Sequence, residues 1–155
     1  MKTAVILIAL FFASMTLFAK VPHGVPDNVK ESFAKLYPNV TDVKWDKEDA
    51  NHFEAEFVEN GKTVSLLFDN NGTLQETETE IAVTELPANV QTVINEKYAG
   101  YKITDASKIV DKDGTVTFEA EISNKKLQKE LIFDLGGNFL NEQPVDDEDS
   151  EEDDD

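Results

Sequence analysis

The stretches HFEAEF (residues 52–57) and TFEAEI (residues 117–122) repeat the tetrapeptide Phe-Glu-Ala-Glu at a distance of 65 residues. Successive side chains of a β-strand point to opposite faces of the sheet. Large apolar residues alternate with glutamates in both copies, so each copy predicts a strand with one apolar and one acidic face. The repetition itself indicates that the chain contains a duplicated unit.

The duplication extends beyond these two strands. SLLFDNNG (residues 65–72) matches ELIFDLGG (residues 130–137) at the same offset, and both runs end in the Asp and Gly typical of a hairpin turn. The remaining strands of the two copies are predicted at residues 40–46, 73–81, 103–111 and 138–142.

A helical pattern precedes the strands in each copy. Apolar residues at helical spacing run from Pro26 to Pro38 in the first copy and from Pro87 to Gly100 in the second. The predicted core-facing stripes are Val29, Phe33, Leu36 and Tyr37 in the first helix and Val90, Ile94 and Tyr98 in the second.

A unit of about 60 residues is marginally stable alone, so the two units are expected to share a core or to continue one sheet. The pattern predicts an α+β fold of two tandem repeats, each a helix followed by four antiparallel strands. Both helices are expected on one face of the sheet, with the other face open. The predicted limits are a signal peptide at 1–19, repeats at 20–82 and 83–144, and a disordered acidic tail at 145–155.

Burial energies predict which face the helices cover. Burying a large apolar side chain contributes roughly 1.5–3 kcal/mol, whereas burying an unpaired carboxylate costs several. The side of Phe53 and Phe118 is therefore expected under the helices, and the glutamate side is expected to be wet.

The two ends of the chain differ from its middle. A lysine, an apolar run and then small residues follow one another in residues 1–19, which is the order of a cleaved secretory signal peptide. The chain has no cysteine, so a lipoprotein anchor is excluded, and the tail contains nine acidic residues. We expect a periplasmic or secreted protein with no membrane attachment after the signal is removed.

The charge of the chain limits its partners. The formal net charge is −18, and arginine is absent. A nucleic-acid-binding protein needs positive charge along its contact surface, so that class is excluded. A basic protein surface or a cation is the natural partner of such a chain.

Four segments carry a family resemblance: FAKLYPNVTDVKW (residues 33–45), FEAEF (53–57), LLFDNNGTLQETETEI (66–81) and ELP (85–87). In order and spacing they resemble the PepSY-like family of exported bacterial proteins, also described as β-lactamase-inhibitor-like (BLIP-like). The run from Thr77 to Pro87 is the most specific part, and the resemblance covers about residues 25–142. It implies a helix-backed antiparallel sheet, export, an origin in Bacteroidetes-type bacteria and no established enzymatic activity.

The glutamate face holds the candidate binding residues. Glu54, Glu56, Glu119 and Glu121 form either a carboxylate patch for a basic partner or divalent ion, or a plain solvated strand face. Alternation also points Leu67 and Ile132 to this face, where each is either a contact residue or covered by a neighbouring segment. Trp45, the single tryptophan, is expected in the core rather than at a binding anchor.

The residues for catalysis are missing. The two histidines, His23 and His52, lack metal-site spacing, and no cysteine or Gly-flanked serine offers a nucleophile. DKDG (residues 111–114) fails the calcium-loop pattern and predicts a β-turn. We therefore expect no enzyme activity, no catalytic residue, no cofactor and no metal site.

Two functions follow as hypotheses. The first is an exported, non-enzymatic binding module, such as an inhibitor or regulator of an extracytoplasmic enzyme, that binds a protein through the open sheet face. The alternative is a low-affinity divalent-cation-binding envelope protein that takes calcium weakly through its tail and glutamate patch. One continuous concave sheet favours the first hypothesis, whereas two independent lobes weaken it.

Overall fold

The computed structural model describes residues 24–125 and 127–144. The predicted signal peptide and acidic tail lie outside the described residues. In chain order the elements are α1 (Asp27–Leu36), β1 (Lys44–Asp46), β2 (His52–Glu59), β3 (Lys62–Asp69), β4 (Leu74–Glu80), the 3-10 turn η1 (Val83–Glu85), α2 (Ala88–Lys97), β5 (Lys102–Asp111), β6 (Val116–Ser123), β7 (Gln128–Asp134) and β8 (Phe139–Pro144).

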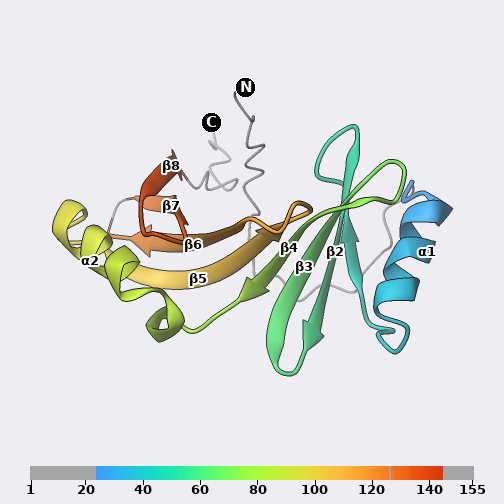
Figure 1. The fold of residues 1–155 in the computed structure, drawn as a ribbon, viewed down its shortest axis with the longest axis horizontal. Helices are drawn as coiled ribbons and strands as arrows, with labels where there is room; N and C mark the ends of the chain where they lie inside the picture. The colour runs from blue at the N-terminus through green and yellow to red at the C-terminus, as the bar shows by residue number, and fades with distance from the viewer. Residues whose placement is uncertain (1–23, 126, 145–155) are drawn as a thin grey trace, which may run out of the picture.

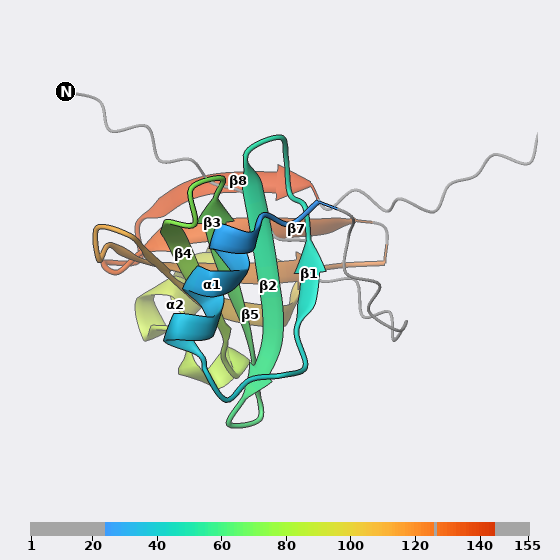
Figure 2. The same cartoon turned by 90° about the vertical axis from the view of Figure 1, so that its right-hand side faces the viewer.

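The eight strands form one antiparallel sheet in sequence order, β1 to β8 (Figure 1). The two repeats join where β4 pairs with β5, from Glu76 opposite Asp111 to Glu80 opposite Ser107. Seen from the side, β2 runs across the direction of β7 and β8, so the sheet twists strongly between its halves (Figure 2). The sheet is therefore continuous across the duplication.

Both helices pack on the same face of this sheet, as the sequence predicted. The strand register carries the Phe53 side of β2 through to the Phe118 side of β6, and each helix lies over its own four strands (Figure 1). Among the described residues, neither helix is long and apolar enough to cross a membrane. The buried residues of the first core are Val25, Val29, Phe33, Trp45, Phe53, Ala55, Phe57, Val64, Leu66 and Phe68. Those of the second are Leu86, Val90, Ile94, Ala106, Phe118, Ala120, Ile122, Leu131 and Phe133.

Trp45 lies in the first core, as predicted, with its ring 5.5 Å from that of Phe33. The predicted apolar stripe of α1 is wrong at Leu36, which is 51% exposed. Leu36 is the last residue of the helix, and the next residue, Tyr37, takes the end of the stripe instead. The Tyr37 ring lies 4.6 Å from that of Phe57.

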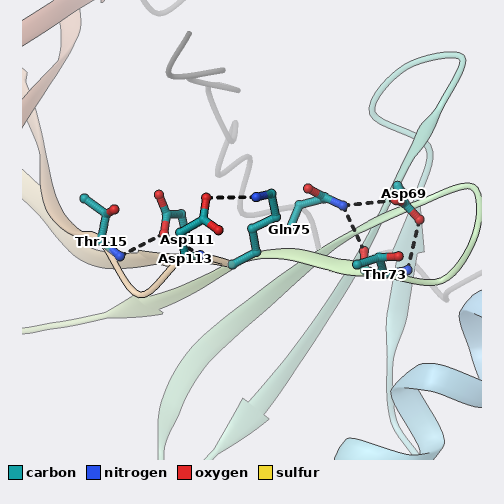
Figure 3. A network of polar contacts seen from close by, with 7 residues as sticks. Asp69, Thr73, Gln75, Asp111, Asp113 and Thr115 are labelled. Atoms are coloured by element: carbon teal, nitrogen blue, oxygen red, sulfur yellow. Dashed lines mark hydrogen bonds and ion pairs between the residues drawn. The ribbon is translucent and has the colours of Figure 1, made fainter. Parts of the chain in front are cut away.

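Three of the hairpins use one turn sequence, Asp-x-x-Gly-x, at residues 69–73, 111–115 and 134–138. In each, the Asp carboxylate accepts the backbone N–H four residues later and the Asp carbonyl accepts the glycine N–H. Figure 3 shows the first two turns side by side, and Gln75 donates to Asp69 at 3.1 Å. The turn predicted at DKDG is thereby confirmed, and so is the one at FDNNG.

The helices are tied to these turns at equivalent places in the two repeats. The side-chain amide of Asn28 in α1 donates to the Asn70 carbonyl, and that of Asn89 in α2 donates to the Gly136 carbonyl. Gly72 lies so close to α1 that a Cβ there would sit 2.7 Å from the Asn28 carbonyl oxygen. The repeat limits 20–82 and 83–144 themselves stay a prediction.

Candidate functional site

The candidate site is the face of the sheet opposite the helices, which we call the open face. Side chains that share a face occupy matched positions along paired strands. By register, its central side chains are Glu54 and Glu56 (β2), Ser65 and Leu67 (β3), Glu76 and Glu78 (β4), Ser107 and Ile109 (β5), Glu119 and Glu121 (β6), and Glu130 and Ile132 (β7).

All six residues predicted for partner binding lie on this face. Glu54 is directly opposite Leu67, and Glu119 is directly opposite Ile132. The duplicated unit thus places the same pair of an acid and an apolar residue in each half. Whether these residues bind a partner stays a prediction.

The prediction that the glutamate side is wet is wrong at its centre. Glu54 and Glu119 are 8% and 7% exposed, and Leu67 and Ile132 are 2% exposed each. Strand alternation assigns a side chain to a face, but its exposure depends on how the sheet bends and on what its neighbours cover. Only the outer members of the predicted patch, Glu56 and Glu121, are partly exposed.

Sequence reasoning missed five buried members of the open face: Ser65, Glu78, Ser107, Ile109 and Glu130, which are 1%, 1%, 4%, 6% and 5% exposed. Glu130 stands where the first repeat has Ser65, so comparing the two copies could have singled it out. Glu78 and Ile109 oppose each other across the seam between the repeats. Their pairing depends on the β4–β5 register, which no local signal in the sequence gives.

Glu78, Glu119 and Glu130 form what we call the carboxylate cluster. Burial raises the pKa of Glu78 to about 7 and that of Glu130 to about 7. Burial also raises the pKa of Glu119 well above its usual range, and the charges of Glu78 and Glu130 add to that rise. Three carboxyl groups on β4, β6 and β7 therefore repel one another when ionised.

Glu54 is a separate buried acid in the first repeat. Burial is the main reason that its pKa rises to about 8, and the negative charges of Glu48 and Glu56 add to the shift. The neighbouring acid Glu56 lies 3.9 Å from the ammonium of Lys44 on β1.

The carboxylate of Glu78 is the unusual group of this face. Among the described residues, neither of its oxygens has a hydrogen-bond partner. Ser107 on β5 partly offsets the rise of its pKa, but the hydroxyl makes no well-oriented hydrogen bond to it. An unsatisfied buried acceptor is costly to the fold, by about 1–3 kcal/mol and more when it is charged, and it is the kind of group that a ligand can satisfy.

The titratable groups near these acids are engaged elsewhere or are themselves acidic. His52 is engaged by Asp49, with Nδ1 and Oδ2 2.9 Å apart, at the edge of β2. Within residues 24–125 and 127–144, no three His, Asp or Glu side chains are close enough together to hold a metal ion. What the open face can do chemically is present negative charge and hydrogen-bond acceptors.

Comparison with known proteins identifies a family whose model matches the chain twice. The family described as "Putative beta-lactamase-inhibitor-like, PepSY-like" matches residues 17–76 and again residues 51–141. No curated protein matches the chain.

Several solved structures share the fold. A BLIP-like protein from Bacteroides fragilis is 26% identical, with a TM-score of 0.63 over 80% of this chain and 91% of that one. A DUF2874 family protein from Bacteroides ovatus is 22% identical, with a TM-score of 0.69 over 80% and 90%. A protein from Bacteroides eggerthii described as a "putative periplasmic" protein is 18% identical, with a TM-score of 0.71 over 79% and 90%.

Proposed function

The chain belongs to the PepSY-like family, and we propose that it is an exported, non-catalytic binding protein that holds a protein partner against its open face. The observation that carries this proposal is the continuity of the sheet. Because β4 pairs with β5, the open faces of the two repeats form one platform eight strands wide. Both described helices, α1 and α2, pack on the opposite face, so neither of them covers the platform.

The charge of the platform supports a basic partner. Partly exposed acids surround its centre on several strands, namely Glu56, Glu76, Glu80 and Glu121. A surface of one charge sign attracts the opposite sign and speeds encounter with it. Leu67 and Ile132 lie buried beneath these acids, so they support the platform from within and leave the contact surface to the partly exposed acids.

Export and inhibition are the finer parts of the proposal. The signal-like residues 1–19 and the description of the Bacteroides eggerthii neighbour support a periplasmic location. The BLIP-like description of the Bacteroides fragilis protein supports an enzyme as the partner, with inhibition or regulation as the outcome.

The test is capture with charge-matched variants. The mature chain, residues 20–155, is immobilised on a resin and incubated with a periplasmic extract of its own host. The proteins that the resin retains are then identified by mass spectrometry. Glu56→Lys and Glu121→Lys reverse charge on the open face. Glu31→Lys and Glu96→Lys reverse charge at exposed positions on the two helices.

We expect a retained protein that is lost from both open-face variants and kept by both helix variants, with its activity altered in the complex. Two results contradict the proposal. In one, no protein is retained specifically; in the other, a protein is retained equally by all four variants, which would place the contact elsewhere.

A further inference from the structure

On the premise that a protein partner binds the open face, we propose that the carboxylate cluster of Glu78, Glu119 and Glu130 is a receptor for an arginine side chain of that partner.

The strand register brings the three acids to one place. Glu78 on β4 and Glu119 on β6 flank β5, where Ile109 and Ser107 are their respective pairing partners. Glu130 on β7 lies opposite Glu121, two residue pairs along the β6–β7 ladder from the pair of Glu119 and Ile132. The negative charge of Glu130 raises the pKa of both Glu78 and Glu119, so the three carboxyl groups are close enough to interact electrostatically.

Glu78 points to a missing ligand. Its side chain is 1% exposed and lies on the same face as the other two acids, yet neither oxygen has a hydrogen-bond partner among the described residues. Glu119 and Glu130 keep 7% and 5% exposure, so the cluster still reaches its surroundings through them. Buried carboxylates are normally paired or hydrogen-bonded, and a cation donated by a partner would supply what is absent.

Among the described residues, none of the ion pairs involves Glu78, Glu119 or Glu130. The charged and titratable side chains that the neighbouring strands turn to this face are His52, Glu54 and Glu56 (β2), Asp69 (β3), Glu76 and Glu80 (β4), Lys102, Asp105 and Asp111 (β5), Glu121 (β6) and Asp134 (β7). Lys102 is the first residue of β5 and lies opposite Ser123, and His52 is engaged by Asp49. The lysine that ion-pairs on this face, Lys44, belongs to the β1 edge, where it contacts Asp46 and Glu56.

The spacing favours a guanidinium over a compact ion. Adjacent strands are about 4.8 Å apart, and the three acids occupy β4, β6 and β7. No group of three acids among the described residues is close enough to enclose a metal ion. A guanidinium has five N–H donors spread in a plane and can bond more than one carboxylate at once, whereas an ammonium is a compact point charge.

The probes are n-butylguanidinium, n-butylammonium and calcium chloride, each titrated into the isotopically labelled mature chain at about pH 8.5. Binding is followed by amide and glutamate-carboxyl NMR shifts. Variants Glu78→Gln and Glu130→Gln are compared with the control Glu96→Gln, an exposed position on α2. We expect saturable shifts on β4–β7 with n-butylguanidinium, weaker by about tenfold in each cluster variant, as for the loss of a charge-assisted hydrogen bond, and unchanged in the control.

Binding should also weaken by at least about tenfold at pH 5.5, because protonated carboxyl groups attract a cation poorly. Three results overturn the proposal: no saturable shifts on β4–β7, equal or tighter binding of n-butylammonium or calcium, or binding that survives Glu78→Gln. A failure of the arginine-receptor proposal can be told apart from a failure of the proposed function. If Glu56→Lys and Glu121→Lys still abolish capture of the periplasmic partner while n-butylguanidinium does not bind, then the open face binds a protein but the carboxylate cluster does not bind arginine.

Discussion

Replacing Glu78 with glutamine should stabilise the folded protein at alkaline pH and leave its stability at about pH 4 unchanged. A carboxyl group with a pKa near 4.5 in the unfolded chain and about 7 in the folded one binds its proton more tightly when folded. Its contribution to stability is therefore fully present below pH 4.5 and is lost as the pH rises through 7. At about 1.4 kcal/mol per pKa unit, the loss is about 3–4 kcal/mol for this one residue.

Glutamine has the shape of the protonated acid and never ionises, so Glu78→Gln should recover about 2–3 kcal/mol at about pH 8.5. The assay is urea denaturation of the mature chain at several pH values, followed by the fluorescence of the buried Trp45. Glu96→Gln removes the same charge from an exposed position and serves as the control. A gain that is equal at both pH values, or absent at high pH, would refute the burial of an ionisable Glu78.

Two further predictions concern the turns and the second repeat. Gly72→Ala and Gly114→Ala both place a side chain at positive φ (+77° and +83°), but only the Gly72 Cβ meets a neighbour, the Asn28 carbonyl oxygen. We expect Gly114→Ala to lower the free energy of unfolding by about 1–2 kcal/mol and Gly72→Ala to lower it by about 1–3 kcal/mol more; equal losses in urea denaturation would contradict that contact. Burial and the hydrogen bond to Glu142 raise the pKa of Tyr98 to about 12. Ultraviolet titration should show this pKa falling toward 10 in Glu142→Gln and staying in place in Glu96→Gln.

The architecture was readable from the sequence because each of its signals is local. The alternation around Phe53 and Phe118 gives the strand face, the prolines bracket α1, and the Asp and Gly residues give the turns. The helical spacing of apolar residues was a poorer guide to burial at the C-terminal end of α1. The spacing of Leu36 matches the core stripe, yet the residue is exposed because Tyr37 fills that place.

The candidate site was readable only in part. Comparing the two copies located Glu54 and Glu119 and their cross-strand partners Leu67 and Ile132, because each pair belongs to a hairpin within one repeat. It did not locate Ile109, whose position opposite Glu78 depends on how β5 pairs with the first repeat.

By itself, the sequence determined a doubled helix-and-sheet unit with an apolar side and an acidic side, because strand and helix periods are properties of neighbouring residues. The tertiary structure decided that the acidic side is buried at its centre. The alternating Thr and Glu residues of β4 are typical of a solvated strand, yet Glu78 is 1% exposed. Burial depends on strands distant in the chain, since Glu78 lies between Ser65 of the first repeat and Ile109 of the second. Desolvation by those neighbours, which no local pattern encodes, makes Glu78 a group whose charge depends on pH near neutrality.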